Sequence, residues 1–401
     1  MKKGISFFLI MLSLVLSAFS QAIWTQKASH QGMARVNIIG FAVNDKGYIA
    51  GGSFGGLSVT ADCQEFNPVS NSWTVKAPMP FAFRAGTGFA AGGKGYTTLG
   101  VNEAMFIQDL LEYNTLGNNW STTVPFPAET RMFASGFGIG AKGYITCGTF
   151  INLTPLNDLW EYDQASNTWT QKADLPGVAR HNATAFTIGD KGYIFGGTDD
   201  MDVLSDLWEY NPATNSWVQK AFLPAGGRTD AVAFSIGNNA YLVGGWPNGG
   251  GALSEVWQYN AADNAWVQLA NFPGTPAAGG TAFSLSGYGY VVGGYGTTQC
   301  WQFDPNTVGF NDQETPSEQI NLIDANGSKT LVINSPEASR IRIMISDLIG
   351  RLVLTNEFEK PTGQFSFGID ESSLNNGAYI ISVYKNGVNT GFAKKMVKVN
   401  F

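Results

Sequence analysis

Short runs of alternating apolar and polar residues, separated by turns rich in Gly, Asn and Pro, cover most of this chain and predict β-strands. Between residues 181 and 221 the strand-like pieces are HNATAFTIG, KGYIFGG, DLWEYN and NSWVQKA. Pieces of this length joined by such short turns are typical of antiparallel sheets. The pattern therefore predicts a sheet of four strands in this part of the chain.

The same four pieces recur along the chain at a nearly constant period. One tyrosine and one tryptophan mark each unit in two series with steps of 47 to 49 residues: Tyr48, Tyr96, Tyr144, Tyr193, Tyr241 and Tyr290, then Trp24, Trp73, Trp120, Trp169, Trp217 and Trp266. A glycine pair follows the second piece at Gly51 and Gly52, Gly196 and Gly197, Gly244 and Gly245, and Gly293 and Gly294. Because the glycine-rich stretch repeats, we interpret it as scaffold rather than as a phosphate-binding loop.

The period near 50, the glycine pair and the tryptophan on the fourth strand resemble kelch repeats over about residues 23 to 310. This resemblance implies an all-β chain with a six-bladed kelch β-propeller, followed here by a small antiparallel β-sandwich. Trp24 precedes the first complete unit, and the last unit ends before its tryptophan. We therefore expect the Trp24 strand to close the sixth blade, which removes two open sheet edges.

The chain divides into four predicted parts. Residues 1–22 have the charged, apolar and small-residue regions of a cleaved signal peptide, with cleavage after Ser20 or Ala22. The propeller is predicted over 23–304, a polar linker over 305–318 and the last part over 319–401. The order DLIGRLV, LNNGAYIISVYKNG and KKMVKV in the last part resembles the C-terminal sorting domain (type A) of the Bacteroidetes type IX secretion system. That resemblance implies passage through the periplasm to the medium or the outer-membrane surface, with the secretion machinery as a partner.

The composition of the chain argues against some classes of binding partner. The net charge of -7 and the absence of a basic stripe argue against nucleic-acid binding. After the predicted signal peptide the sequence has no further apolar segment long enough to predict a transmembrane helix. We expect the protein to be a monomer. The repeats place Cys63, Cys147 and Cys300 at core positions, which predicts buried thiols, with a disulfide between Cys63 and Cys300 as the less favoured alternative.

The loops after the second and fourth strands of each unit are long and varied, and they share one face, which we call the rim. Arg35, Arg84, Arg131, Arg180 and Arg228 precede the first strands, either as an anion site or, as we prefer, as supports of the loops. Residues two positions further on differ between units and are better pocket candidates. The predicted ligand-binding residues are Arg84, Arg131, Phe133, Arg180, Asn182, Arg228, Asp230, Trp246 and Tyr295.

No established catalytic motif is present, and catalytic residues stay unassigned. The two histidines, His30 and His181, do not form a recognisable copper set. The acidic loop Asp199, Asp200 and Asp202 is interpreted as solvated rather than as a calcium site, so we predict no metal and no cofactor. The favoured hypothesis is a secreted or cell-surface module that binds a glycan or a protein through the rim. The alternative is a carbohydrate-active enzyme such as a sialic-acid mutarotase, for which Arg180, Arg228 and Asp230 would be mutated first.

Overall fold

The computed structural model describes residues 24–54, 58–103, 105–150, 154–305, 319–325, 328–335, 339–347, 352–360, 363–369, 374, 376–385 and 388–398. Every regular element in these ranges is a β-strand. The predicted signal peptide lies outside the described residues, as does nearly all of the predicted linker.

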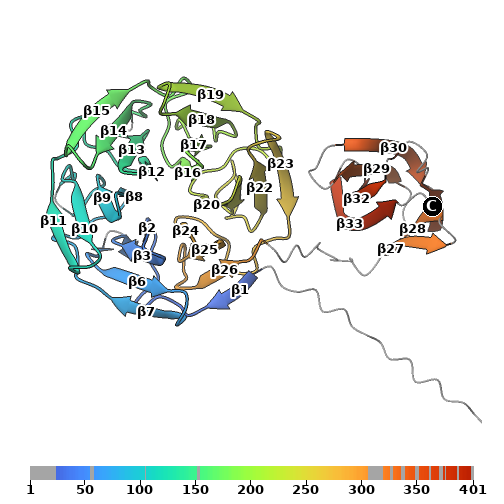
Figure 1. Cartoon of the computed structure of the whole chain (residues 1–401), viewed down its shortest axis with the longest axis horizontal. Coiled ribbons are helices and arrows are strands. Elements are labelled where there is room, and N and C mark those ends of the chain that lie inside the picture. The colour runs from blue at the N-terminus through green and yellow to red at the C-terminus, as the bar shows by residue number, and fades with distance from the viewer. Residues whose placement is uncertain are drawn as a thin grey trace, which may run out of the picture.

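Six four-stranded antiparallel sheets form a ring, with one strand of each sheet innermost (Figure 1). Strands are given from the innermost outward: the first blade contains β2 (Ile39–Val43), β3 (Lys46–Ala50), β6 (Cys63–Asn67) and β7 (Ser72–Val75), and the second contains β8 (Thr87–Ala91), β9 (Lys94–Thr98), β10 (Leu111–Asn114) and β11 (Asn119–Thr122). The third blade contains β12 (Ser135–Ile139), β13 (Lys142–Thr146), β14 (Leu159–Asp163) and β15 (Thr168–Lys172), and the fourth contains β16 (Thr184–Ile188), β17 (Lys191–Phe195), β18 (Leu207–Asn211) and β19 (Ser216–Lys220). The fifth blade contains β20 (Val232–Ile236), β21 (Asn239–Val243), β22 (Val256–Asn260) and β23 (Ala265–Leu269). A short pair, β4 (Ser53–Phe54) and β5 (Ser58–Val59), follows β3. The six-bladed propeller predicted from the repeats is confirmed.

The sixth blade joins the two ends of the propeller. It consists of β24 (Thr281–Leu285), β25 (Tyr288–Val292), β26 (Cys300–Phe303) and β1 (Trp24–Lys27), with Trp24 opposite Phe303 in the β1–β26 pair. The Trp24 ring also contacts Phe272, with ring centroids 4.9 Å apart, and is only 6% exposed. The closure predicted for the Trp24 strand is confirmed.

Several glycines before the second-strand tyrosines occur where a side chain has no room. A Cβ on Gly143, just before Tyr144, would lie 2.0 Å from the ring of Phe89 in the neighbouring blade. The glycine pair has positive φ at both positions, for example 63° at Gly196 and 87° at Gly197. Leu99 and Cys147 adopt the same conformation at the first position, so only the second position always requires glycine.

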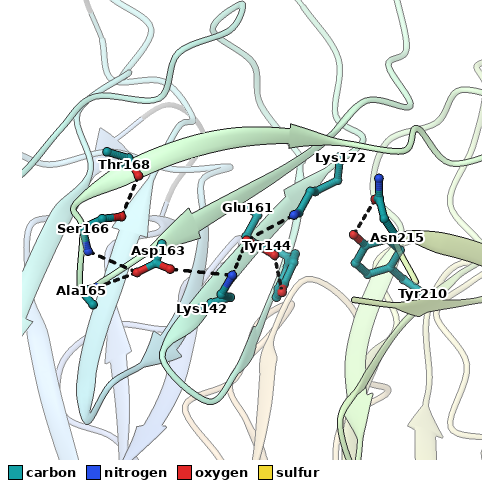
Figure 2. Close-up of polar contacts among 10 residues, drawn as sticks. All are labelled: Lys142, Tyr144, Glu161, Asp163, Ala165, Ser166, Thr168, Lys172, Tyr210 and Asn215. Atoms are coloured by element: carbon teal, nitrogen blue, oxygen red, sulfur yellow. Dashed lines mark hydrogen bonds and ion pairs between the residues drawn. The ribbon is translucent and has the colours of Figure 1, made fainter. Parts of the chain in front are cut away.

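A buried ion-pair network ties the second strand of a blade to the third and fourth. In the third blade the Tyr144 hydroxyl donates to Glu161 Oε2 over 2.7 Å, and Lys142 and Lys172 lie on Oε1 of the same carboxylate (Figure 2). Burial alone would raise the pKa of Glu161, but these hydrogen bonds and charges hold it below its ordinary value. The same tyrosine and glutamate positions are bonded in the first, second and fourth blades.

The fourth-strand tryptophans connect neighbouring blades. Five of them donate an indole N–H to a backbone carbonyl of the preceding blade, over 2.7 to 3.4 Å: Trp73, Trp120, Trp169, Trp217 and Trp266. Trp24 has no such bond within the described residues. Its contribution is therefore the burial of its ring.

The C-terminal part forms two antiparallel sheets, as the sequence predicted. One contains β27 (Gln319–Ala325), β28 (Ser328–Ser335) and β31 (Gly363–Gly368), and the other contains β30 (Leu352–Lys360), β29 (Ser339–Asp347), β32 (Gly377–Lys385) and β33 (Val388–Lys398). Ile341, Ile343 and Ile345 alternate along β29 and are buried in one core with Leu331 and Ile333 of β28. Alternate residues of β29 therefore join the two sheets.

Candidate functional site

The residues that lead into the innermost strands form one ring at the rim. Each blade contributes three successive positions to this axial ring, which comprises residues 35–37, 83–85, 131–133, 180–182, 228–230 and 277–279. The third positions adopt positive φ in all six blades, at Asn37, Ala85, Phe133, Asn182, Asp230 and Gly279. Backbone N–H groups at five of them donate to the third-position carbonyl of the preceding blade, for instance Asp230 to Asn182 over 3.1 Å.

The first positions of the axial ring are structural. The guanidinium of Arg180 is fully buried, makes two hydrogen bonds to the carboxylate of Asp206 and donates to the carbonyl of Gly196. Arg131 pairs in the same way with Asp158. Arg228 pairs with Glu255 over 3.0 Å and Arg35 with Asp62 over 2.9 Å. These arginines support the loop after the second strand, which agrees with the preferred structural interpretation.

Arg84 does not belong to this set, so the sequence-based alignment of five arginines was wrong at this blade. The first position in the second blade is Phe83, which is fully buried, and Arg84 occupies the second position, bonded through its backbone to Val101. The corresponding pocket candidate is therefore Ala85 rather than Gly86. Arg84 is half-buried, and its guanidinium has no ion pair within the part of the chain that the structure describes.

Polar side chains at the second and third positions form a connected chain in the fourth and fifth blades. His181 Nε2 lies 2.9 Å from Asp200 Oδ1, and His181 Nδ1 contacts Asn182 Oδ1. The amide nitrogen of Asn182 donates to Asp230 Oδ1. This relay of four side chains joins the acidic loop after β17 to the fifth blade, and the other blades have different residues at its positions.

Asp230 is the acidic residue of the axial ring, and its pKa is shifted. Burial raises its pKa above the ordinary value for aspartate, although hydrogen bonds from Asn182 and Thr229 and the charge of His181 act in the opposite direction. Asp206 behaves differently, because the hydrogen bonds and charge of Arg180 outweigh burial and lower its pKa. A carboxyl group of raised pKa among polar neighbours is a common property of functional sites.

Aromatic side chains lie beside the relay. The rings of Trp246 and Tyr295 meet edge to face with centroids 5.9 Å apart, and Tyr295 is 64% exposed. Trp246 pairs through its backbone with Thr229, and Tyr295 donates its backbone N–H to Ala278. Phe133 lies 6.2 Å from the imidazole of His181. The structure thus brings Phe133, Asn182, Asp230, Trp246 and Tyr295 to the axial ring or its edge.

The other groups considered for chemistry have structural surroundings. Among the described residues no group of three or more His, Cys, Asp or Glu side chains is arranged to hold a metal ion. Asp199 caps its own loop by accepting hydrogen bonds from the backbone of Met201 and Asp202. Cys63, Cys147 and Cys300 are buried and unpaired, as predicted, and burial raises the pKa of the Cys147 thiol to about 11.

Comparison with known proteins identifies both parts of the chain. Residues 125–294 match the family model described as a KLHDC2/KLHL20/DRC7 Kelch-repeats domain, and residues 315–399 match that of the secretion system C-terminal sorting domain. The chain is a kelch-repeat propeller with a type IX sorting domain. The sorting domain indicates export by the type IX secretion system to the cell surface or the extracellular space. No helix in the described part of this kelch protein is long and apolar enough to cross a membrane.

Solved structures support the propeller fold. One that is similar to the kelch protein is titled "Structure of YjhT", with a TM-score of 0.56 and 15% sequence identity, covering 71% of this chain and 96% of that chain. At this identity the likeness concerns the fold alone. No curated protein sequence matches the chain.

Sequence reasoning missed the relay and the acidic partners of the arginines. The partners had a signal, because in the blades with a buried arginine an acidic residue follows it by 26 or 27 residues. The second blade keeps the acidic member, since Asp109 follows Phe83 by 26 residues, but it has no arginine at the first position, and Arg84 is only 25 residues before Asp109. Nothing in the spacing of His181 and Asp200 indicates their contact, because it depends on the path of the loop after β17.

Proposed function

We propose that this exported kelch propeller is a binding module that takes a glycan or protein ligand at the second and third positions of the axial ring. The observation that supports this is the distribution of the repeat. First positions carry buried arginines with acidic partners in four blades. Second and third positions instead hold a polar relay and an arginine without an ion pair among the described residues, and the rings of Trp246 and Tyr295 lie beside them. A rigid scaffold with irregular side chains at one site is the usual design of a binding surface.

The test is a binding screen of the full exported chain on arrays of glycans and of surface proteins. We expect at least one ligand whose binding is weakened about tenfold or more by Asp230→Asn. The matched control is Asp190→Asn, which makes the same change at an exposed turn on the opposite face. Equal effects of the two substitutions, or no ligand at all, would contradict the proposal.

An isomerase acting on a sugar is a second candidate, and it rests on two observations. Asp230 has a raised pKa, and Arg84, which has no ion pair among the described residues, comes from the second blade, opposite the fifth in the ring (Figure 1). A carboxyl group of raised pKa suits acid–base catalysis of ring opening better than an ordinary aspartate does. NMR of bound sugars would detect faster exchange between anomers, which Asp230→Asn abolishes if this candidate is correct. Binding without exchange supports the binding module.

A further inference from the structure

The six blades contribute side chains of different size to the axial ring. The sixth blade contributes Ala277, Ala278 and Gly279, so it presents no side-chain atom beyond Cβ. Backbone strain does not explain Gly279, because the other five third positions hold residues with side chains at similar positive φ. A Cβ on Gly279 would meet nothing closer than 3.6 Å. Gly279 therefore leaves room for at least a Cβ atom, in ordinary contact with Val36 of the first blade.

Polar groups flank this space. Gly279 donates its backbone N–H to the carbonyl of Asp230 in the fifth blade, and its own carbonyl accepts from the N–H of Asn37 in the first blade. A carboxyl group and a carboxamide thus occupy the two third positions on either side of Gly279. Together they offer hydrogen-bond acceptors and a donor to a polar ligand.

Aromatic groups border the same side of the ring. Trp246 is bonded through its backbone to Thr229, directly before Asp230, and Tyr295 is bonded to Ala278, directly before Gly279. Their rings meet edge to face, and the Tyr295 ring is mostly exposed. Exposed rings beside hydrogen-bonding groups suit ligands that have both an apolar face and hydroxyl groups.

The charged side chains of the axial ring indicate whether an acidic or an uncharged sugar would fit beside Asp230. Arg84, which has no ion pair among the described residues, belongs to the second blade, whereas Asp230 belongs to the fifth. Arg228 and Arg180 are buried and paired with acidic residues, so they are not offered to a ligand. An acidic sugar seated between Asp230 and Asn37 would bring its carboxylate beside that of Asp230, and no unpaired arginine lies in the neighbouring blades of the described ring. An uncharged sugar would instead donate its hydroxyl hydrogens to that carboxylate.

We infer that Asp230, Asn37, Trp246 and Tyr295 form the seat for one uncharged pyranose residue, with the space at Gly279 receiving part of the ring. This inference rests on the proposed binding function and specifies its ligand class and its location. Asp230 accepts hydrogen bonds from the sugar, and Trp246 or Tyr295 contacts its apolar face.

The test uses the full exported chain and the methyl glycosides of galactose, mannose, N-acetylglucosamine and N-acetylneuraminic acid, titrated by calorimetry or ligand-observed NMR. We expect at least one of the three uncharged glycosides to bind and the acidic one not to bind. Trp246→Ala should weaken binding about tenfold or more. Gly279→Asn should also abolish binding, because it places in the space a residue that Asn37 and Asn182 show to be compatible with this backbone.

Two substitutions serve as controls. Phe222→Ala removes another exposed ring, and Gly237→Asn makes the same change at a positive φ with nothing within 4 Å. Both should leave the affinity unchanged within twofold and show that the variants fold. The inference is overturned if only the acidic glycoside binds, if none of the uncharged glycosides binds, or if Gly279→Asn binds as wild type. A protein ligand found in the screen would still uphold the broader binding function in any of these cases.

Discussion

Arg180 and Asp230 belong to neighbouring parts of the same axial ring, yet their surroundings differ in kind. Arg180 has a bidentate acidic partner, and the same arrangement recurs at Arg131. Asp230 has an amide partner, a raised pKa and no counterpart in any other blade. The comparison teaches that in a repeat protein the repeated polar groups hold the scaffold, whereas the polar groups that break the repeat mark the site where a ligand is sought.

The largest expected effect concerns the scaffold itself. Trp24→Ala should reduce the free energy of unfolding by about 3 to 5 kcal/mol, because it removes a buried indole and weakens the strand pair that closes the ring. Trp120→Ala should cost less, since Trp120 is half-buried and lies in a complete blade. Thermal and urea unfolding of the two variants would measure this, and equal losses would mean that closure adds nothing.

The second prediction separates the two kinds of arginine. Arg180→Ala leaves the carboxylate of Asp206 largely buried without its partner and should cost about 3 to 5 kcal/mol of stability. Arg84→Ala removes a half-buried arginine without an ion pair among the described residues, and should change stability by less than about 0.5 kcal/mol. Urea unfolding checks both values. Similar losses of stability in the two variants would contradict the distinction between repeated and irregular positions.

A third prediction uses a hydroxyl group that is bonded in one blade but not in another. Tyr144→Phe should cost about 1.5 kcal/mol, because the Tyr144 hydroxyl donates to the charged Glu161. Tyr241→Phe should cost under about 0.5 kcal/mol, because burial alone raises the pKa of Tyr241 and its hydroxyl has no hydrogen bond within the described residues. The difference between the two unfolding midpoints is the measurement, and a reversed order would contradict the role given to the network in Figure 2.

The smallest effect is expected at Asp230 and has the opposite sign. A carboxyl group whose pKa is raised by folding stabilises the protein when protonated, and this contribution is lost as the pH rises through the raised pKa. Asp230→Asn should therefore raise the melting temperature slightly at pH 7, and the gain should disappear near pH 4. A variant that is less stable than wild type at pH 7 would show that Asp230 is part of the scaffold.

For Asp206 the sign is reversed. Its lowered pKa gives stability that is present above the ordinary aspartate pKa and lost as the pH falls through the lowered value. Asp206→Asn should accordingly destabilise the protein at pH 7. A pH series of both variants contrasts the two carboxyl groups directly.

The sequence predicted the features that depend on local or repeated patterns. The six blades, the closing Trp24 strand and the buried thiols follow from periodicity, because each unit buries the same positions. The alignment of Arg84 failed because arginine alone does not identify the position, whereas the spacing of 26 or 27 residues to the later acid does. The contact of His181 with Asp200 needed the loop path, which no short-range pattern encodes.

The pairing of β1 with β26 also affects the order in which the parts of the propeller can assemble. The first residues of the propeller along the chain, Trp24 to Lys27, have their sheet partners among its last, Cys300 to Phe303. Until these two strands pair, the chain is an open arc with an unpaired strand at its end and an apolar indole without a site to fill. Completion of the ring is therefore a late, single event, and a chain truncated before Cys300 would expose the edges that the complete ring conceals.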